Sequence, residues 1–162
     1  VVYHAQTPRI DVGTDPQRAE GMADLEALNR LAISQMMETT VAAEPTGYVP
    51  PPLDGIWARY PYFHHHAAPT LCDVLSPPEE RTTTYVQGPA DDPDTDFNMD
   101  CVGYPTGDAI PEDWREDEEA WVTLGGPGQT VAGHDEMLYD EAGDLVIQGE
   151  ARAALVAFLK TL

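Results

Sequence analysis

The sequence predicts a mainly α-helical domain with long irregular loops and a few short strands. Two segments carry the helical periodicity of apolar residues, one near each end of the chain, and the region between them is rich in turn-forming residues. The 162 residues include 15 prolines and 13 glycines, an above-average content that favours long connections over regular structure. We expect a single domain over residues 1–162, because this length suits one hydrophobic core.

The first predicted helix follows an extended arm over residues 1–14. Thr14 or Asp15 can cap its start, and Pro16 suits its first turn. The helix is expected to continue to about Thr39. Its apolar residues recur every three or four positions and predict a packing face, made of Met22, Leu25, Leu28, Ala32 and Met36.

The remaining elements are shorter, apart from a closing helix. A helix over residues 69–75 is ended by Pro77 and Pro78, and β-branched and aromatic residues predict short strands at 82–86 and 121–124. Residues 90–100 form an acidic insertion that should stay solvated unless it binds cations. The closing helix is predicted from about Gly149 to Leu162, with a buried face made of Ala151, Leu155, Phe158 and Leu159.

The charge of the chain excludes some classes of partner. Eight Lys and Arg stand against 29 Asp and Glu, a formal net charge of −21, which opposes binding to nucleic acid or to anionic lipid. It favours Ca²⁺ or a basic redox partner as ligand. The sequence holds no long apolar run, so we expect no transmembrane segment. If the protein is exported, its leader has been removed or lies upstream of Val1.

The two cysteines, Cys72 and Cys101, are not spaced for zinc or for haem attachment. Two alternatives remain from the residues alone. A disulfide would close a long loop and contribute about 3–4 kcal/mol, and it would indicate a periplasmic or extracellular location. Two buried free thiols would carry no such implication.

The most unusual stretch covers residues 55–64, which follow a run of three prolines and hold Trp57, Arg59, Tyr60, Tyr62, Phe63 and His64. Aromatic rings offer flat apolar surface, and a guanidinium offers a forked donor for carboxylates. Together they meet the two needs of a haem, a face and partners for its propionates. The structural alternative is a small aromatic core with Arg59 in a salt bridge.

In its order of residues, this stretch resembles the haem-cradling segment of bacterial di-haem cytochrome c peroxidases and of the related rubber-oxygenase-like cytochromes. In those families the segment begins with Pro-Tyr, which is followed by Leu, Phe or Met. His and then Asn/Asp-Gly-Ser come next, and Thr-Leu follows further along. Further short motifs of the rubber-oxygenase-like branch recur in order along nearly the whole chain: residues 12–16 with Arg18, Pro69 to Leu71, Asp92-Pro93 with residues 102–104, residues 132–134, and residues 158–162.

The resemblance implies that the chain is the C-terminal part of a cytochrome c-like domain. It would then form one wall and the distal side of a c-type haem pocket in a di-haem electron-transfer protein. The pocket residues it implies are Trp57, Arg59, Tyr62 and His64, with His134 as an axial ligand of the haem iron. From the residues alone, His134 is equally an exposed loop histidine.

This chain departs from the family pattern in three ways. It has no Cys-x-x-Cys-His, so the haem c attachment cysteines are expected outside it, on an upstream haem-bearing polypeptide or another cytochrome subunit. His65-His66-Ala67 replaces Asn/Asp-Gly-Ser and adds two ligands, although a zinc or copper site would need help from elsewhere in the chain. The methionine ligand of the peroxidase branch has no counterpart. A peroxidase-like or oxygenase-like activity cannot be assigned, because the active haem of these families lies in another domain.

Two other functions remain open. One is a haem-free extracytoplasmic structural or docking subunit of a redox or photosynthetic membrane complex, with an acidic surface that attracts a basic partner. The other is calcium binding by oxygen ligands at alternate positions of the acidic insertion. The simpler interpretation of the same residues is a solvated acidic loop. Phe97 and Gly103 stand where an EF-hand requires Gly and Glu. The proposed calcium ligands are Asp92, Asp94, Asp96, Asn98 and Asp100.

Overall fold

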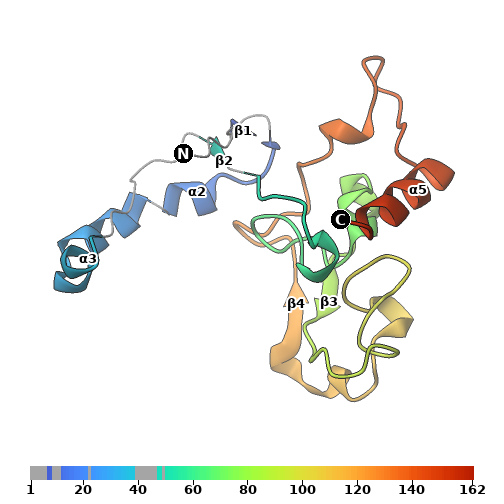
Figure 1. The fold of residues 1–162 in the computed structure, drawn as a ribbon, viewed down its shortest axis with the longest axis horizontal. Coiled ribbons are helices and arrows are strands. Elements are labelled where there is room, and N and C mark those ends of the chain that lie inside the picture. Colours follow the sequence, from blue (N-terminus) through green and yellow to red (C-terminus); the bar gives the residue numbers. More distant parts are fainter. Residues whose placement is uncertain (1–6, 9–11, 22, 39–46, 49) are drawn as a thin grey trace.

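The computed structural model describes residues 7–8, 12–21, 23–38, 47–48 and 50–162 (Figure 1). Its α-helices are short, except the last, and most of its helical turns are 3₁₀ turns, labelled η. In chain order the elements are β1 (Thr7–Pro8), α2 (Gln17–Gly21), η1 (Ala23–Arg30), α3 (Ala32–Met36), β2 (Gly47–Tyr48), η2 (Ile56–Ala58), α4 (Leu71–Val74), η3 (Pro78–Glu80), β3 (Thr84–Val86), η4 (Gly107–Ala109), η5 (Trp114–Glu116), η6 (Glu118–Ala120), β4 (Trp121–Thr123), η7 (Glu136–Leu138) and α5 (Gly149–Leu159).

Long connections join these elements, as the proline and glycine content predicts. The strands form two separate antiparallel pairs, β1 with β2 and β3 with β4. In the second pair Tyr85 lies opposite Val122, so both predicted strands are confirmed. None of the helices described here is long and apolar enough to cross a membrane.

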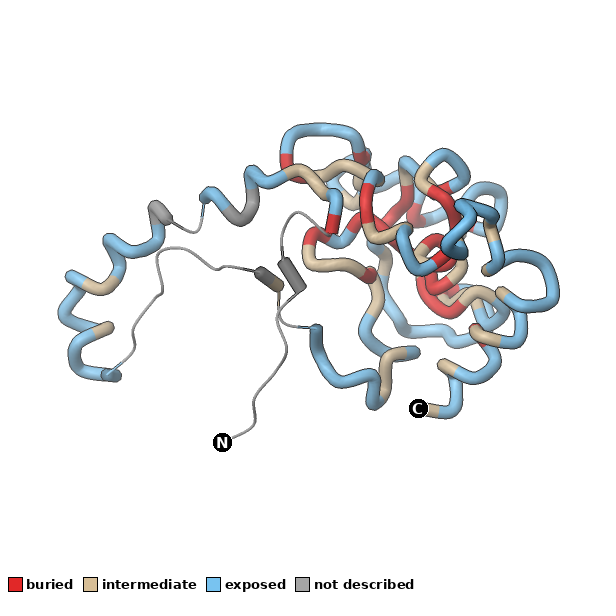
Figure 2. The backbone as a smooth tube through the Cα atoms, turned by 90° about the horizontal axis from the view of Figure 1, so that it is seen from above, coloured by how far each residue is buried: buried red, intermediate tan, exposed pale blue. Residues whose placement is uncertain are grey.

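The largest core cluster lies where α4, α5 and the 62–68 loop meet. Its buried members come from four distant parts of the chain: residues 62–75 with Tyr62, Ala68, Leu71 and Leu75, then Val102, Leu138 and Val156. Figure 2 shows the buried segments gathered in this half of the molecule. Two smaller clusters extend the core, one around Tyr85 of β3 and one around Trp114 of η5.

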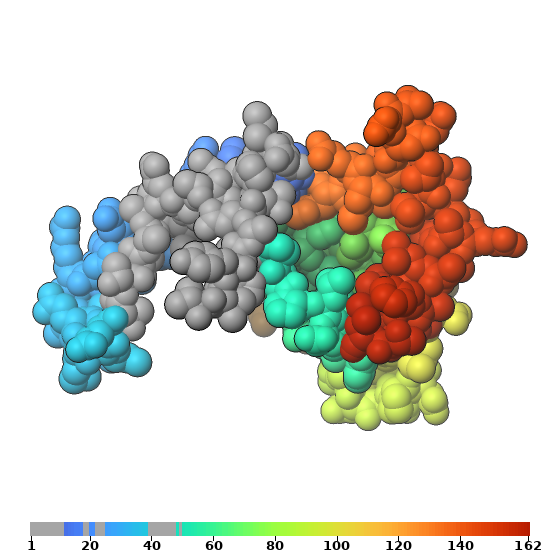
Figure 3. Space-filling model, turned by 45° about the horizontal axis from the view of Figure 1, so that its top comes forward, coloured from blue at the N-terminus to red at the C-terminus, as the bar shows by residue number. Residues whose placement is uncertain are grey.

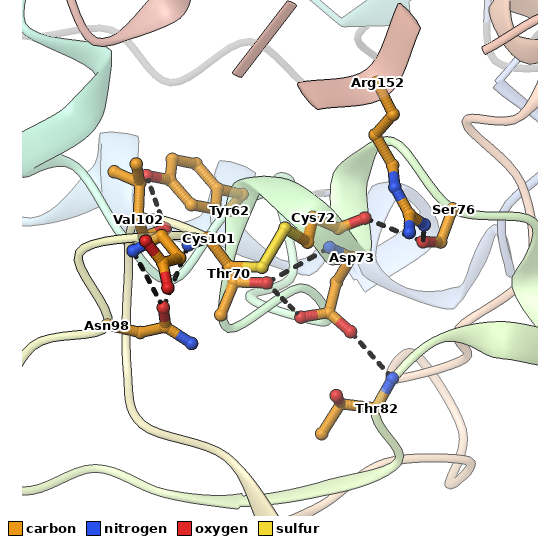
Figure 4. Close-up of a disulfide and its surroundings, with 11 residues drawn as sticks. Tyr62, Thr70, Cys72, Asp73, Ser76, Thr82, Asn98, Cys101, Val102 and Arg152 are labelled. Carbon is orange, nitrogen blue, oxygen red and sulfur yellow. Dashed lines mark hydrogen bonds between the residues drawn. A yellow bond between two sulfur atoms is a disulfide. The ribbon is translucent and has the colours of Figure 1, made fainter. Parts of the chain in front are cut away.

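A disulfide and a capped helix hold the centre of this core (Figure 4). Cys72 on α4 is bonded to Cys101 at the end of the acidic insertion, which selects the first of the two alternatives for these cysteines. Thr70 caps α4, since its Oγ1 accepts a hydrogen bond from the Asp73 amide at 3.1 Å. The carboxylate of Asp73 accepts bonds from the Thr70 hydroxyl and from the Thr82 amide. The short helix predicted over residues 69–75 is therefore confirmed.

The helix predicted from Asp15 to Thr39 is wrong as a continuous element. Asp15 does cap its start, accepting from the Gln17 amide at 2.9 Å, but the helix ends at Gly21 and is followed by η1 and α3. Glycine is a poor helix former, and among the described residues no other element covers the apolar stripe. The stripe residues Leu25, Leu28, Ala32 and Met36 are exposed, which corrects the predicted packing face; Met22 lies outside the described residues.

The closing helix is confirmed as α5, with a different buried face. Val156 is buried and Leu155 and Leu159 are half-buried, whereas Ala151 and Phe158 are exposed. At the end of the chain, the Leu162 carbonyl accepts a bond from the Gly55 amide at 3.0 Å. The segment that opens the aromatic stretch therefore lies beside the C-terminal helix, as Figure 3 shows.

Candidate functional site

A tight loop presents two adjacent histidines in one direction. The Tyr62 amide donates to the Ala68 carbonyl at 2.7 Å, and the His66 amide donates to the Phe63 carbonyl at 3.3 Å. Phe63 and His66 have positive φ angles of 66° and 61°, so the chain reverses sharply within the loop. This turn leaves His65 buried, His64 half-buried and His66 exposed.

A second loop brings His134 to the same place. Its backbone is also left-handed, at φ 56°, and follows Gly133 at φ 81°. A Cβ on Gly133 would lie 2.4 Å from the Val12 carbonyl oxygen, so only glycine fits there. The His134 amide donates to that same carbonyl at 2.8 Å, which fixes the loop against the N-terminal segment.

Arg81 holds the loop from the other side. Its buried guanidinium donates at 2.6 Å to the carbonyls of Val131 and Gly133, and more weakly, at 3.4 Å, to that of His134. Its Nε donates to the Asp73 and Ser76 carbonyls at the end of α4. The arginine thereby joins the disulfide-bonded core to the His134 loop.

The three imidazoles converge. Nε2 of His134 lies 3.3 Å from Nδ1 of His64, across 70 residues of sequence. One nitrogen from each of His64, His65 and His134 lies within 4.8 Å of the other two. In the described part of the chain, this is the one group of three or more such side chains arranged to hold a metal ion.

Aromatic rings pack against the cluster. Phe63 stacks on the His134 ring with 4.2 Å between centroids and 7° between planes, and Tyr48 stacks on His64 at 4.1 Å. The Arg81 guanidinium carbon lies 5.1 Å from the centre of the Phe63 ring. These flat contacts restrict the rotation of the imidazoles and exclude water from their faces.

The environment keeps His134 neutral. Burial is the largest cause that lowers the pKa of His134, and together with the nearby groups of His64, His65 and Arg81 it brings this pKa to about 4. A neutral imidazole retains the lone pair that a metal ligand needs. His65 is oriented by its second nitrogen, since Nε2 lies 2.7 Å from the Thr130 carbonyl oxygen. A carbonyl only accepts, so Nε2 of His65 carries the proton of this hydrogen bond.

The other predicted haem-pocket residues lie elsewhere. Trp57 lines a separate, mostly apolar cavity of about 480 Å³, together with Tyr60, Phe97 and Met99. The Arg59 guanidinium is exposed and donates to the Pro52 carbonyl at 3.0 Å. Tyr62 is buried in the main core, where burial raises the pKa of its phenol. The structure therefore brings His64 and His134 together, apart from the cavity that Trp57 lines.

The acidic insertion uses its oxygens internally. The Asp96 carboxylate accepts from the amides of Asp91 and Asp92, and Asp92 accepts from the Asp94 amide. The Asn98 side chain accepts from the amides of Asp100 and Cys101. These bonds stabilise turns, and the bond from the Asp92 amide is the largest cause that lowers the pKa of Asp96. The calcium hypothesis thus gains no convergent ligand set from these residues.

The sequence indicates Phe63 as part of the aromatic surface and His65 as an additional ligand, but it places neither beside His134, and it gives Arg81 no role. The run of three histidines was the available signal for His65, but its burial and its approach to His134 depend on the left-handed turn. Nothing in the local sequence indicates that Arg81 binds carbonyls about 50 residues away.

Comparison with known proteins identifies a cytochrome c-like segment in the chain. Residues 47–86 match the family model described as RoxA-like, cytochrome c-like, which includes the aromatic stretch, His64, His65 and α4. His134 lies outside the matched range. The match indicates an electron-transfer or haem-related role.

One curated relative is an uncharacterized protein, y4iJ, from Sinorhizobium fredii (strain NBRC 101917 / NGR234). It is 35% identical over 122 residues, which cover 73% of this chain and 18% of the relative. The chain therefore spans less than a fifth of that protein's length. No solved structure matches the chain.

The residues present fit part of what a c-type haem needs. Imidazole nitrogens and flat aromatic rings are the donor set and the surface that a haem uses. The thioether bonds must come from elsewhere, because both cysteines of the chain are joined to each other. His64 also faces His134 at 3.3 Å, so one of the two side chains must turn aside before the other can ligate a haem iron.

Proposed function

We propose that this chain forms one wall and the distal side of a c-type haem pocket in a di-haem electron-transfer protein. The observation that carries the proposal is the meeting of His134 with His64, a residue of the segment that matches the cytochrome c-like family. His134 would serve as the axial ligand, and Phe63 would keep its ring in a fixed plane. A bound haem supplies one-electron redox chemistry.

The rest of the chain has a supporting role in this proposal. Arg81 and Gly133 hold the backbone of the ligand loop, and the Cys72–Cys101 disulfide fixes the core behind it. A disulfide fits a periplasmic or extracellular location. The charge of −21 would favour a basic redox partner, with an association rate that falls as salt rises. The haem-bearing cysteines would lie on an upstream polypeptide or another subunit.

The test is to express the gene that encodes this chain, with the coding sequence that precedes Val1, in a periplasm able to attach haem c. We expect a Soret band that survives denaturation, and a haem-linked peptide by mass spectrometry that maps upstream of Val1. His134→Ala should convert a low-spin spectrum to a high-spin one, whereas His66→Ala should not, because His66 is exposed outside the cluster.

Two results would overturn the proposal. A coloured protein whose spectrum is the same with and without the His134 imidazole would exclude the ligand role. A colourless protein would favour the second candidate, a haem-free structural or docking subunit of a redox or photosynthetic membrane complex. The absence of Cys-x-x-Cys-His from the chain is the observation that keeps this second candidate.

A further inference from the structure

The three-histidine cluster also has the dimensions of a site for a bare metal ion. A tetrahedral zinc ion binds imidazole nitrogens at about 2.0–2.1 Å, which places two such nitrogens about 3.3–3.4 Å apart. Nε2 of His134 and Nδ1 of His64 are 3.3 Å apart. The pair therefore already has the separation of two zinc ligands, before any ion is bound.

His65 supplies the third nitrogen. All three ligand atoms lie within 4.8 Å of one another. Small side-chain rotations that shift the nitrogens by about an ångström would therefore bring all three within bonding distance of one ion. The bond from His65 Nε2 to the Thr130 carbonyl is the outer-shell contact that orients a metal-binding imidazole and selects its tautomer. Three imidazoles leave a fourth position for water or another small ligand.

We propose that His64, His65 and His134 form a binding site for one divalent transition-metal ion, with Zn²⁺ as the ion that fits best. Imidazole suits zinc and copper. The donor set contains no carboxylate, which would favour a harder ion, and no thiolate, which would favour a softer one. The positive charge of Arg81 faces this region, but its guanidinium is directed to backbone carbonyls.

This site goes beyond the proposed function, because it concerns the chain without haem. An ion held by all three imidazoles and a haem iron ligated by His134 exclude each other. The ion would thus bind the His134 imidazole before haem is inserted, or take the place of the haem in a haem-free subunit. The two proposals fail separately, since zinc affinity is measured on the 162-residue chain and haem ligation on the longer product.

The experiment is a calorimetric titration of the 162-residue chain, freed of metal with EDTA and dialysed, with Zn²⁺ at pH 7.5. We expect one strong site per chain. His134→Ala and His65→Ala should each weaken binding at least tenfold, since each removes one of three ligands. His66→Ala is the matched control, because it removes a neighbouring exposed imidazole and should leave the affinity unchanged.

Circular dichroism and a thermal melt of each metal-free variant separate loss of a ligand from loss of the fold. His134→Gln offers a second, more conservative variant if His134→Ala unfolds. Co²⁺ provides an independent readout, because a tetrahedral Co²⁺ site gives intense visible absorption that an octahedral surface ion lacks. Zinc binding that is equally strong in the wild type and both cluster variants, or an effect of His66→Ala as large as theirs, would refute the site. Binding of no zinc by the folded wild type would refute it as well.

Discussion

The guanidinium of Arg81 donates to the carbonyl of Gly133 at 2.6 Å and so ties the core around α4 to the loop that ends in His134. Four backbone carbonyls accept bonds of 3.1 Å or less from this one side chain. Two belong to Asp73 and Ser76 at the end of α4, and two belong to Val131 and Gly133, just before His134. The position of His134 therefore depends on a residue that is itself no ligand.

Replacing Arg81 should destabilise the protein and loosen the site together. We expect Arg81→Leu to lower the free energy of unfolding by about 3 kcal/mol, because it leaves several buried carbonyls without their donor. Denaturant unfolding measures this change. Arg115→Leu is the control, since its guanidinium also binds carbonyls but in a more exposed setting, and its cost should be about 1 kcal/mol or less. Equal costs for the two variants would contradict the role assigned to Arg81.

Removing the disulfide should lower stability without changing the fold. The bridge joins residues 29 positions apart, and a loop of this length corresponds to about 3–4 kcal/mol in the free energy of unfolding. We expect the free energy of unfolding of the Cys72→Ser, Cys101→Ser double variant to be lower by that amount, and its melting temperature to fall accordingly. Dithiothreitol should destabilise the wild type to the same level and leave the variant unaffected. A wild type indifferent to the reductant would show that the bridge contributes little.

Gly103 is required by a close approach of two backbones. Its φ is +146°, and a Cβ there would lie 2.1 Å from the Pro69 carbonyl oxygen, next to the N-cap of α4. We expect Gly103→Ala to cost about 2–4 kcal/mol, because backbone atoms and no flexible side chain must move. Gly126→Ala, where no atom lies within 4 Å, should be nearly neutral. Comparable melting temperatures for both variants would show that the chain relaxes easily at Gly103.

Acidification should destabilise the metal-free chain through His134. Its pKa is about 4 in the folded protein, against an ordinary value near 6.5, so the unfolded chain takes up the proton first as the pH falls. The stability that this histidine contributes is complete above about pH 6.5 and is lost as the pH falls towards 4. Urea unfolding in EDTA at pH 7.5, 6 and 4.5 measures the loss, and His134→Gln should reduce it. The same decline in the variant would assign it to other groups.

Several elements could be predicted from the sequence because their causes are local. Thr70 and the prolines around it set the bounds of α4, β-branched and aromatic residues define β3 and β4, and the run of good helix formers after Gly149 makes α5. The aromatic stretch and its resemblance to cytochrome families were also readable, and the match over residues 47–86 supports that interpretation.

Tertiary structure alone decided which apolar stripe is covered and that His65 joins His64 and His134, the pair that the resemblance implied. The periodicity of Leu25, Leu28 and Met36 is compatible with burial, but a stripe is buried only if another surface lies against it, and none of the elements described here does. His64 and His134 meet because of a left-handed turn, a glycine approach to Val12 and an arginine that binds distant carbonyls. Those contacts join residues 50 or more positions apart, and the pattern of neighbouring residues carries no record of them.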